Sequence, residues 1–299
     1  MRKEVEVDEA LNLLLDVPVK LDIEPITIGE AHGRVSSEAV MAEISLPPFD
    51  RSPFDGYALR GEDTESATKK RPVTLSVRQE IPAGYMPKAA VTVGYAAKIM
   101  TGAPIPSGAN AVVKFEDTEF TKYTVTLFAP VKPGANVVRA GEDVPAGTEI
   151  LSQGALIEPA IMGILAAQGL KYVKVYKRPV VSVVNTGSEL AELGRPLLPG
   201  MIYNSSMYTL QGFLMNAGVE FRTGGIVADD ERSIAARIRA ELATSDMVIT
   251  TGGASVGDYD CTVAAAEIAG GDVLFWKVQM KPGGSMLAYT LGGKLVLAL

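Results

Sequence analysis

The segment 246–260, DMVITTGGASVGDYD, places glycines, a serine and two carboxylates directly after a short apolar run. Glycines let a backbone turn tightly and approach a ligand, and amide N–H groups at the start of a helix attract anions. Carboxylates repel anions unless a hard cation such as Mg2+ lies between them and bridges to phosphate. The loop therefore favours a phosphate held together with a divalent cation, while a strand-to-helix turn capped by an aspartate would use the same residue types. The candidate residues are Gly252, Gly253, Ser255, Gly257, Asp258 and Asp260.

Two further loops carry carboxylates where predicted strands end. TGSEL at 186–190 contains Glu189, and VADDERS at 227–233 contains Asp229 and Asp230. Each of these residues suits a ligand site, but each also suits the start or the cap of the following helix. For the aspartate pair, capping is the favoured interpretation.

Two lysines, Lys277 and Lys281, lie in the segment FWKVQMKPGGS at 275–285. Paired ammonium groups can bind phosphate or another oxyanion through charge-assisted hydrogen bonds. A solvated edge strand would look similar in sequence, so both interpretations stay open at this point.

The region before residue 145 has polar turns of its own. LPPFDRSPFDGYALRGED at 46–63 contains Asp50 and Asp55, MTGAP contains Thr101, and RAGEDV contains Asp143. Asp55 before Gly56 is a common turn signal, Pro104 and Pro106 make a rigid turn after Thr101, and RAGEDV suits a charged turn. A structural turn therefore explains these segments as well as a ligand site does.

Composition excludes several classes of protein. The chain has 299 residues, enough for two or three compact units, and its net charge of −7 argues against a nucleic-acid partner. The single histidine, His32, and the single cysteine, Cys261, leave no credible nucleophile set or structural zinc site. The most apolar stretch, 157–170, is shorter than the roughly 20 residues of a membrane helix. With an N-terminus too acidic for a signal peptide, these features predict a soluble, cytoplasmic protein.

Two regions with different sequence patterns contain the strands and helices that must position the candidate residues. Between Pro25 and Val138, short alternating runs such as PVTLSV and YTVTLF are separated by proline and glycine, which predicts a β-rich region. After Arg178, strand-like runs such as PVVSVVNTG alternate with helix-like ones such as SSMYTLQGFLMNAG. This alternation predicts an α/β domain with a mostly parallel sheet and helices on both faces, whose ligands would lie at the carboxyl ends of the strands. Helices are also predicted near the N-terminus, capped by Asp8, and over 156–170.

The order of the motifs along the chain is more specific than any one of them. LPPFDRSPFDGYA, IMTGAPIP, RAGEDV, NTGSEL, GGASVGDYD and KVQMKPG together closely resemble the molybdopterin molybdenumtransferase family, which includes MoeA and the gephyrin E domain. The resemblance implies three parts: a mostly helical linking domain from 1–40 and 141–177, an inserted β-rich domain over 41–140, and an incomplete α/β molybdopterin-binding domain, like the molybdopterin adenylyltransferases, over 178–299. The family's C-terminal β-barrel domain would be absent, so we expect a fragment of a longer protein that is inactive by itself.

The family reaction inserts molybdate into adenylylated molybdopterin and releases AMP, so the resemblance implies an enzyme of molybdenum cofactor biosynthesis. It also implies a homodimer whose active site lies between the α/β domain of one subunit and the β-rich domain of the other, and molybdopterin adenylyltransferase as the upstream partner. The implied catalytic residues are Asp55, Thr101, Asp143, Glu189, Lys277 and Lys281. The implied metal ligands are Asp229 and Asp260, with Mg2+ or another divalent cation as cofactor.

One departure from the family pattern follows MKPG, where the usual Lys-Pro is replaced by Gly284 and Ser285. The missing lysine would help to hold the oxyanion. We therefore expect weaker molybdate binding, which Gly284→Lys would strengthen, or a subgroup that handles tungstate. The rival interpretation is a non-catalytic molybdopterin-binding or scaffold protein of the same fold. The acidic positions favour the enzyme, and the glycine at position 284 favours its rival.

Overall fold

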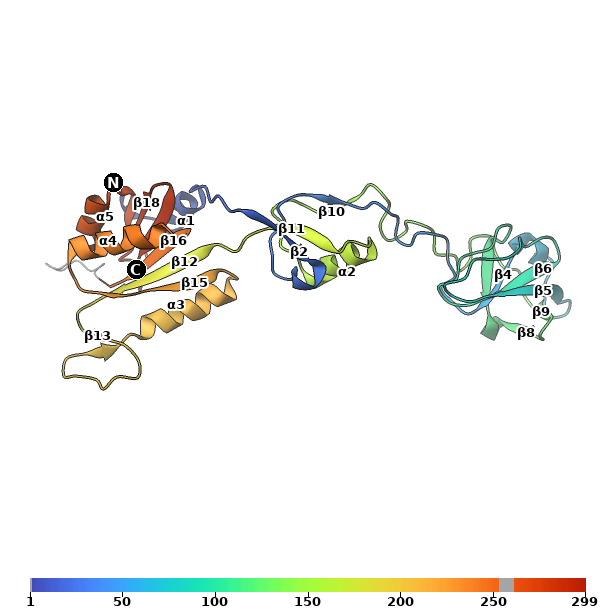
Figure 1. Ribbon diagram of the computed structural model, residues 1–299. Helices are drawn as coiled ribbons and strands as arrows, with labels where there is room; N and C mark the ends of the chain where they lie inside the picture. Colours follow the sequence, from blue (N-terminus) through green and yellow to red (C-terminus); the bar gives the residue numbers. More distant parts are fainter. Residues whose placement is uncertain (1, 253–260) are drawn as a thin grey trace. The chain divides into compact units, whose positions relative to one another are not determined.

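The structure is a computed structural model that describes residues 2–252 and 261–299 (Figure 1). It divides into two compact units. The first unit contains Met1–Ile26, Gly33–Ser37 and Lys174–Leu299, and the second contains Thr27–His32 and Glu38–Val173. The N-terminal residues therefore belong with the C-terminal part of the chain.

A seven-stranded mixed sheet forms the centre of the first unit. Its strands are, in spatial order, β1 (Arg2–Val5), β17 (Asp272–Val278), β18 (Leu287–Leu291), β19 (Lys294–Ala298), β16 (Met247–Thr251), β12 (Val180–Thr186) and β15 (Glu220–Val227). β19, β16, β12 and β15 run parallel, as do β1 and β17, whereas β18 is antiparallel to both of its neighbours. The sheet is thus mostly parallel, as predicted, with one antiparallel strand set into it.

Helices cover both faces of this sheet, as the alternation in the sequence predicted. They are α1 (Val7–Leu15), α3 (Ser205–Asn216), α4 (Glu231–Leu242) and α5 (Cys261–Ala269). α4 and α5 bury side chains such as Ile238 and Ala265 in one cluster with Val184. α1 and α3 pack on the opposite face, where α3 contacts Val183 and both helices belong to clusters that include Leu297. Val183 and Val184 face opposite ways because side chains alternate along a strand.

No helix in the described part of the chain combines the length and the apolar character that a membrane span requires.

The N-terminal segment joins the edge of the sheet. β1 pairs with β17, and α1 buries Ala10 in a cluster with Phe275 and Val278. The prediction that Asp8 caps α1 is wrong, because the N-cap is Glu6, which makes no side-chain cap hydrogen bond. Asp8 lies inside the first turn, where a negative charge still suits the helix dipole.

A six-stranded sheet forms the centre of the second unit. Its strands are, in spatial order, β7 (Ala111–Lys114), β4 (Gly56–Leu59), β6 (Tyr95–Ile99), β5 (Val73–Ile81), β9 (Thr124–Leu127) and β8 (Thr118–Phe120). Tyr57 and Leu59 of β4 lie in one apolar cluster, while Ala58 between them lies in another. β4 is therefore buried on both faces, and the β-rich region predicted from the alternating runs is confirmed.

The flanking segments contain short strands as well as helices. They include β2 (Ile23–Thr27), η1 (Ile28–Glu30), β3 (Val40–Met41), β10 (Glu149–Leu151), α2 (Pro159–Ala167) and β11 (Tyr172–Tyr176). α2 begins at Pro159 after the predicted Glu158, and the Gln168 side chain after it exchanges three hydrogen bonds with the backbone of Glu43 and Ile44. The division of the chain into a linking, an inserted and an α/β domain stays a prediction.

Candidate functional site

The ends of β12 and β16 are held together by polar side chains. Nδ2 of Asn185 donates to Oγ1 of Thr251 at 2.5 Å, and Oγ1 of Thr186 donates to the Thr251 carbonyl at 3.2 Å. Gly252 follows with φ of +91°, and a Cβ there would overlap the carbonyl oxygen of Thr186. Only glycine allows this close approach. Asn185 is fully buried inside an apolar strand sequence, so sequence reasoning did not single it out.

The remaining predicted residues of the glycine loop, Gly253, Ser255, Gly257, Asp258 and Asp260, lie outside the described residues. Within residues 2–252 and 261–299, no group of three or more histidine, cysteine, aspartate or glutamate side chains is placed to hold a metal ion. The pairing of Asp229 with Asp260 around a divalent cation therefore stays a prediction.

The two aspartates after β15 have different partners, one at the start of α4 and one in a neighbouring loop. Asp230 caps α4 by accepting from the Ser233 N–H at 2.8 Å. Hydrogen bonds from the Ser233 side chain and backbone hold the pKa of Asp230 below its usual value. Asp229 instead accepts from the Ser188 N–H at 3.0 Å. Capping thus explains Asp230 and leaves Asp229, an exposed residue, on the loop at the carboxyl edge of the sheet.

The hydrogen bond to Ser188 brings Asp229 beside the loop that carries Glu189. The Glu189 carboxylate folds back over Gly187, where a Cβ would lie only 2.6 Å from Oε2. Sγ of Cys261, the first residue of α5, is 3.7 Å from the Asp229 carbonyl oxygen. The structure therefore joins three segments that are distant in sequence at one edge of the sheet.

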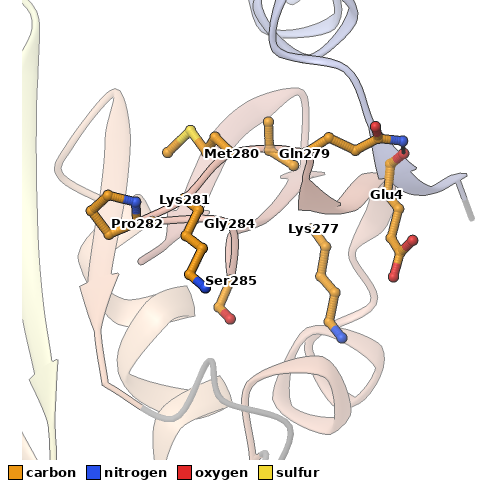
Figure 2. A pocket seen from close by; sticks show the side chains of 10 residues that line it. Glu4, Lys277, Gln279, Met280, Lys281, Pro282, Gly284 and Ser285 are labelled. Atoms are coloured by element: carbon orange, nitrogen blue, oxygen red, sulfur yellow. Dashed lines mark hydrogen bonds between the residues drawn. The ribbon is translucent and has the colours of Figure 1, made fainter.

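The two predicted lysines line one pocket of about 400 Å³ at the turn between β17 and β18. Figure 2 shows Lys277, Lys281 and Ser285 extending to the same side of this turn. Lys281 is exposed, and Nζ of Lys277 lies 4.9 Å from the ring centroid of Trp276. Two ammonium groups in one pocket suit a tetrahedral oxyanion, because each offers three donors and a full positive charge.

Glu4 lines the same pocket from β1. Its position follows from the pairing of β1 with β17, which connects the two ends of the sequence. No motif in the N-terminal segment had indicated a site, so sequence reasoning missed this residue.

Gly284 lies in a tight part of the turn. Its carbonyl accepts from the N–H groups of Val278 at 2.9 Å and Met286 at 3.1 Å. A Cβ on Gly284 would lie 2.7 Å from the carbonyl oxygen of Met280 and 2.8 Å from that of Val278. The expectation that Gly284→Lys restores an oxyanion contact stays a prediction, and in this turn the added side chain would also have to displace backbone. Ser285 is the exposed neighbour that lines the pocket.

Asp55 and Thr101, predicted from two separate motifs, contact each other in the second unit. Oδ1 of Asp55 accepts from both the N–H and the hydroxyl of Thr101, each at 2.7 Å. The N–H of Thr101, followed by its hydroxyl, holds the pKa of Asp55 below its usual value. The pair therefore keeps a carboxylate ionised in a fixed position.

Asp143 is exposed, and its backbone N–H donates to the Leu46 carbonyl at 3.0 Å. The turn before it is anchored by Asp50, which accepts from the Ala140 N–H at 2.8 Å and from Arg139 at 2.6 Å. These partners, chiefly the Ala140 N–H, lower the pKa of Asp50. Asp50 therefore has a structural role that fixes the loop carrying Asp143.

These features define a protein of two parts, an α/β unit with a cation-lined pocket and polar loops at its sheet edge, and a β-rich unit with a fixed carboxylate. Family models match both parts of the sequence. Residues 5–169 match the MoeA N-terminal region (domain I and II), and residues 182–299 match a probable molybdopterin binding domain. The chain belongs to the MoeA family.

Named relatives agree with this assignment. Molybdopterin molybdenumtransferase 2 of Mycobacterium tuberculosis is 41% identical over 266 residues, which cover 87% of this chain and 66% of the relative. Molybdopterin molybdenumtransferase of Nostoc sp. is 37% identical over 281 residues, which cover 93% of this chain and 64% of the relative. The chain thus spans slightly less than two thirds of the length of these curated relatives.

A solved structure shows the same fold. The molybdopterin biosynthesis MoeA protein from Pyrococcus horikoshii superposes with a TM-score of 0.84 at 33% sequence identity. The match covers 99% of this chain and 74% of that one. The fold of the described chain is therefore that of MoeA.

Proposed function

We propose that this protein acts as a molybdopterin molybdenumtransferase, the activity named for its curated relatives. In this proposal it inserts molybdate or tungstate into adenylylated molybdopterin, with release of AMP. The observation that carries the proposal is the pocket lined by Lys277 and Lys281 in a chain of the MoeA family. A doubly charged oxyanion substrate is stabilised where cations and hydrogen-bond donors converge.

The adenylylated part of the substrate is assigned to the carboxyl edge of the α/β sheet. Gly252 lets backbone approach closely at the end of β16, and consecutive amides at such a turn suit phosphate. Asp229 is exposed at the same edge. In the proposal Asp229 and Asp260 hold Mg2+ or another divalent cation, and Ser255 contacts phosphate.

The proposal includes a homodimer, in which Asp55, Thr101 and Asp143 of one copy act together with the α/β part of the other. Exposed apolar side chains on α1 support association, because Val7, Leu11 and Leu15 recur at intervals of four residues. Molybdopterin adenylyltransferase is the proposed upstream partner, since it supplies the adenylylated substrate. Light scattering at micromolar concentration tests the dimer, and a monomer mass would refute it.

A non-catalytic molybdopterin-binding protein of the same fold is the second candidate. The absence of the family's lysine at position 284 favours it, because the pocket then has one cation fewer. The retained carboxylates and both remaining lysines favour the enzyme.

A turnover assay on the whole gene product that contains this sequence decides between the two. Adenylylated molybdopterin is incubated with Mg2+ and either molybdate or tungstate, and AMP release is followed together with metal incorporation. The enzyme predicts AMP formation that depends on the oxyanion and falls in Lys281→Met. Binding of the adenylylated substrate without AMP release would support the non-catalytic candidate instead.

A further inference from the structure

Strand β1 brings a carboxylate into the lysine pocket. The register pairs Lys3 with Trp276 and Val5 with Val278, so Glu4 lies opposite Lys277. The pairing continues beyond the strand, where the backbone N–H of Gln279 donates to the Val5 carbonyl at 2.8 Å and Nε2 of Gln279 donates to the Glu4 carbonyl at 2.9 Å. The position of Glu4 is therefore fixed by the sheet itself.

Glu4 and Lys277 share an unusual backbone conformation. Their φ angles are +57° and +68°, and they account for two of the three non-glycine residues with positive φ in the described part of the chain. Residues with side chains rarely adopt this region and keep it where the surroundings impose it, often at functional sites. Two opposed residues in this conformation in one pocket indicate that the pocket is built to present both side chains.

The side chains of Glu4 and the two lysines share one space without neutralising each other. Figure 2 shows Glu4, Lys277 and Lys281 extending to the same side of the β17–β18 turn. Across residues 2–252 and 261–299, the Glu4 carboxylate forms neither an ion pair nor a hydrogen bond. Its charge is therefore available to act on whatever anion the lysines bind.

We propose that Glu4 is a specificity-determining residue that sets the charge selectivity of the lysine pocket. This inference rests on the proposed oxyanion site and deepens it. The Glu4 carboxylate repels a bound anion in proportion to the anion's charge, so it weakens the binding of doubly charged tetrahedral oxyanions more than that of singly charged ones. The pocket then binds its oxyanion weakly enough to release it to the reaction.

Equilibrium dialysis with two tetrahedral oxyanions of similar size and different charge tests the proposal. The probes are tungstate, with two negative charges, and perrhenate, with one. Coulomb's law at surface dielectric constants puts the gain in tungstate affinity from Glu4→Gln at about 3- to 10-fold. The gain for perrhenate is the square root of that factor, about 2- to 3-fold, because half the charge feels half the repulsion.

Two further variants control for charge and geometry. Glu4→Asp keeps the charge and is expected to bind tungstate about as the unmodified protein does. Glu6→Gln removes the same charge from the N-cap of α1, which makes no side-chain cap hydrogen bond and does not line the pocket, and it is expected to leave both affinities nearly unchanged. The gain in tungstate affinity from Glu4→Gln should also shrink in 1 M salt, where the Debye length is only about 3 Å.

The outcomes separate this inference from the function on which it rests. If Lys281→Met weakens tungstate binding while Glu4→Gln leaves it unchanged or weaker, the role of Glu4 is overturned and the oxyanion site stands. Equal gains for tungstate and perrhenate would also overturn it, because the selectivity would then not follow charge. If neither Lys277→Met nor Lys281→Met alters tungstate binding, the oxyanion site itself is overturned, and the role of Glu4 with it.

Discussion

The Asp55–Thr101 pair and the lysine pocket are both groups of polar side chains at turns, but their charged groups differ in how many hydrogen bonds they receive from the chain. The Asp55 carboxylate accepts two hydrogen bonds of 2.7 Å from one residue. Lys281 is exposed, and Nζ of Lys277 lies 4.9 Å from the centroid of the Trp276 ring. Within residues 2–252 and 261–299, the Asp55 carboxylate finds its hydrogen-bond donors in Thr101, whereas the two lysine ammonium groups form neither an ion pair nor a hydrogen bond.

This difference indicates that the Asp55–Thr101 pair positions a carboxylate, whereas the two lysines are suited to bind a ligand. A carboxylate held by a backbone N–H has a lowered pKa and a fixed direction, so it is ready to act as an ionised group without rearrangement. Exposed ammonium groups can exchange water for charge-assisted hydrogen bonds to an anionic ligand. The strongest effects on ligand affinity are therefore expected at the lysines, and subtler effects on protonation are expected at Asp55.

Removal of the lysine charges is expected to have the largest effect on oxyanion binding. Lys277→Met and Lys281→Met should each lower tungstate affinity by ~1.5–3 kcal/mol, the typical contribution of a hydrogen bond to a charged group. Calorimetry or equilibrium dialysis measures the change. Lys20→Met is the matched control, because Lys20 is an exposed lysine in the same unit that does not line the pocket. An equal loss in the control would show that net charge, not the pocket, attracts the anion.

The fold was largely predictable because the periodic signals were strong. The apolar run before Thr186 and the amphipathic run after Asp230 gave β12 and α4 within a few residues. The cap of α1 was missed, since an aspartate at position 8 suits the first turn as well as the N-cap. The strand β1 was missed for a different reason: a four-residue run gives no period, and it forms only because β17 offers an open edge.

The candidate site was predictable in its parts but not in its pairings. Sequence motifs named Asp55 and Thr101 without showing that they contact each other, and they left Asp229 and Asp230 equivalent. The structure shows that Asp55 and Thr101 contact each other. It also distinguishes the two aspartates, because Asp230 caps α4 and Asp229 accepts from Ser188. Glu4 had no motif at all, since its role depends on a strand pairing across nearly the whole chain.

Asp229 is intermediate between the Asp55–Thr101 pair and the lysine pocket, because its carboxylate accepts a hydrogen bond from the Ser188 backbone N–H and is still exposed. If it binds a divalent cation, Asp229→Asn should weaken Mg2+-dependent binding of AMP or ADP by ~1.5–3 kcal/mol. Asp230→Asn is the matched control, because asparagine caps a helix about as well as aspartate does. Calorimetry with Mg2+ and with EDTA tests this prediction. Equal nucleotide affinity in EDTA would exclude a bridging metal.

The position of an added lysine should matter more than its charge. Gly284→Lys is expected to lower the free energy of unfolding by ~1–3 kcal/mol, as other overpacked positions do, because its Cβ would press on two backbone carbonyls. Ser285→Lys adds the same charge at an exposed position of the pocket and should raise tungstate affinity by ~1 kcal/mol. Denaturant unfolding and dialysis on the two variants measure both effects. Unchanged stability in Gly284→Lys would show that the turn adapts.

The smallest expected effect is a shift in the titration of Asp55. Its pKa lies below the ordinary 3.8 because the Thr101 N–H and then the Thr101 hydroxyl stabilise the ionised form. The folded state therefore gains stability from ionised Asp55 above pH 3.8, and it loses that contribution as the pH falls through the lowered pKa. Thr101→Val removes the hydroxyl and keeps the N–H, so the pKa should rise while staying below 3.8.

Carboxyl 13C NMR of labelled aspartate follows this titration directly. Thr74→Val is the control, because it removes a hydroxyl that contacts Thr126 in the same sheet and should leave Asp55 unchanged. A pKa of Asp55 that does not move in Thr101→Val would mean that the backbone N–H alone holds the carboxylate. The hydroxyl of Thr101 would then be free to serve a ligand, and the Asp55–Thr101 pair would no longer be complete within the chain but would resemble the lysine pocket in keeping a donor open.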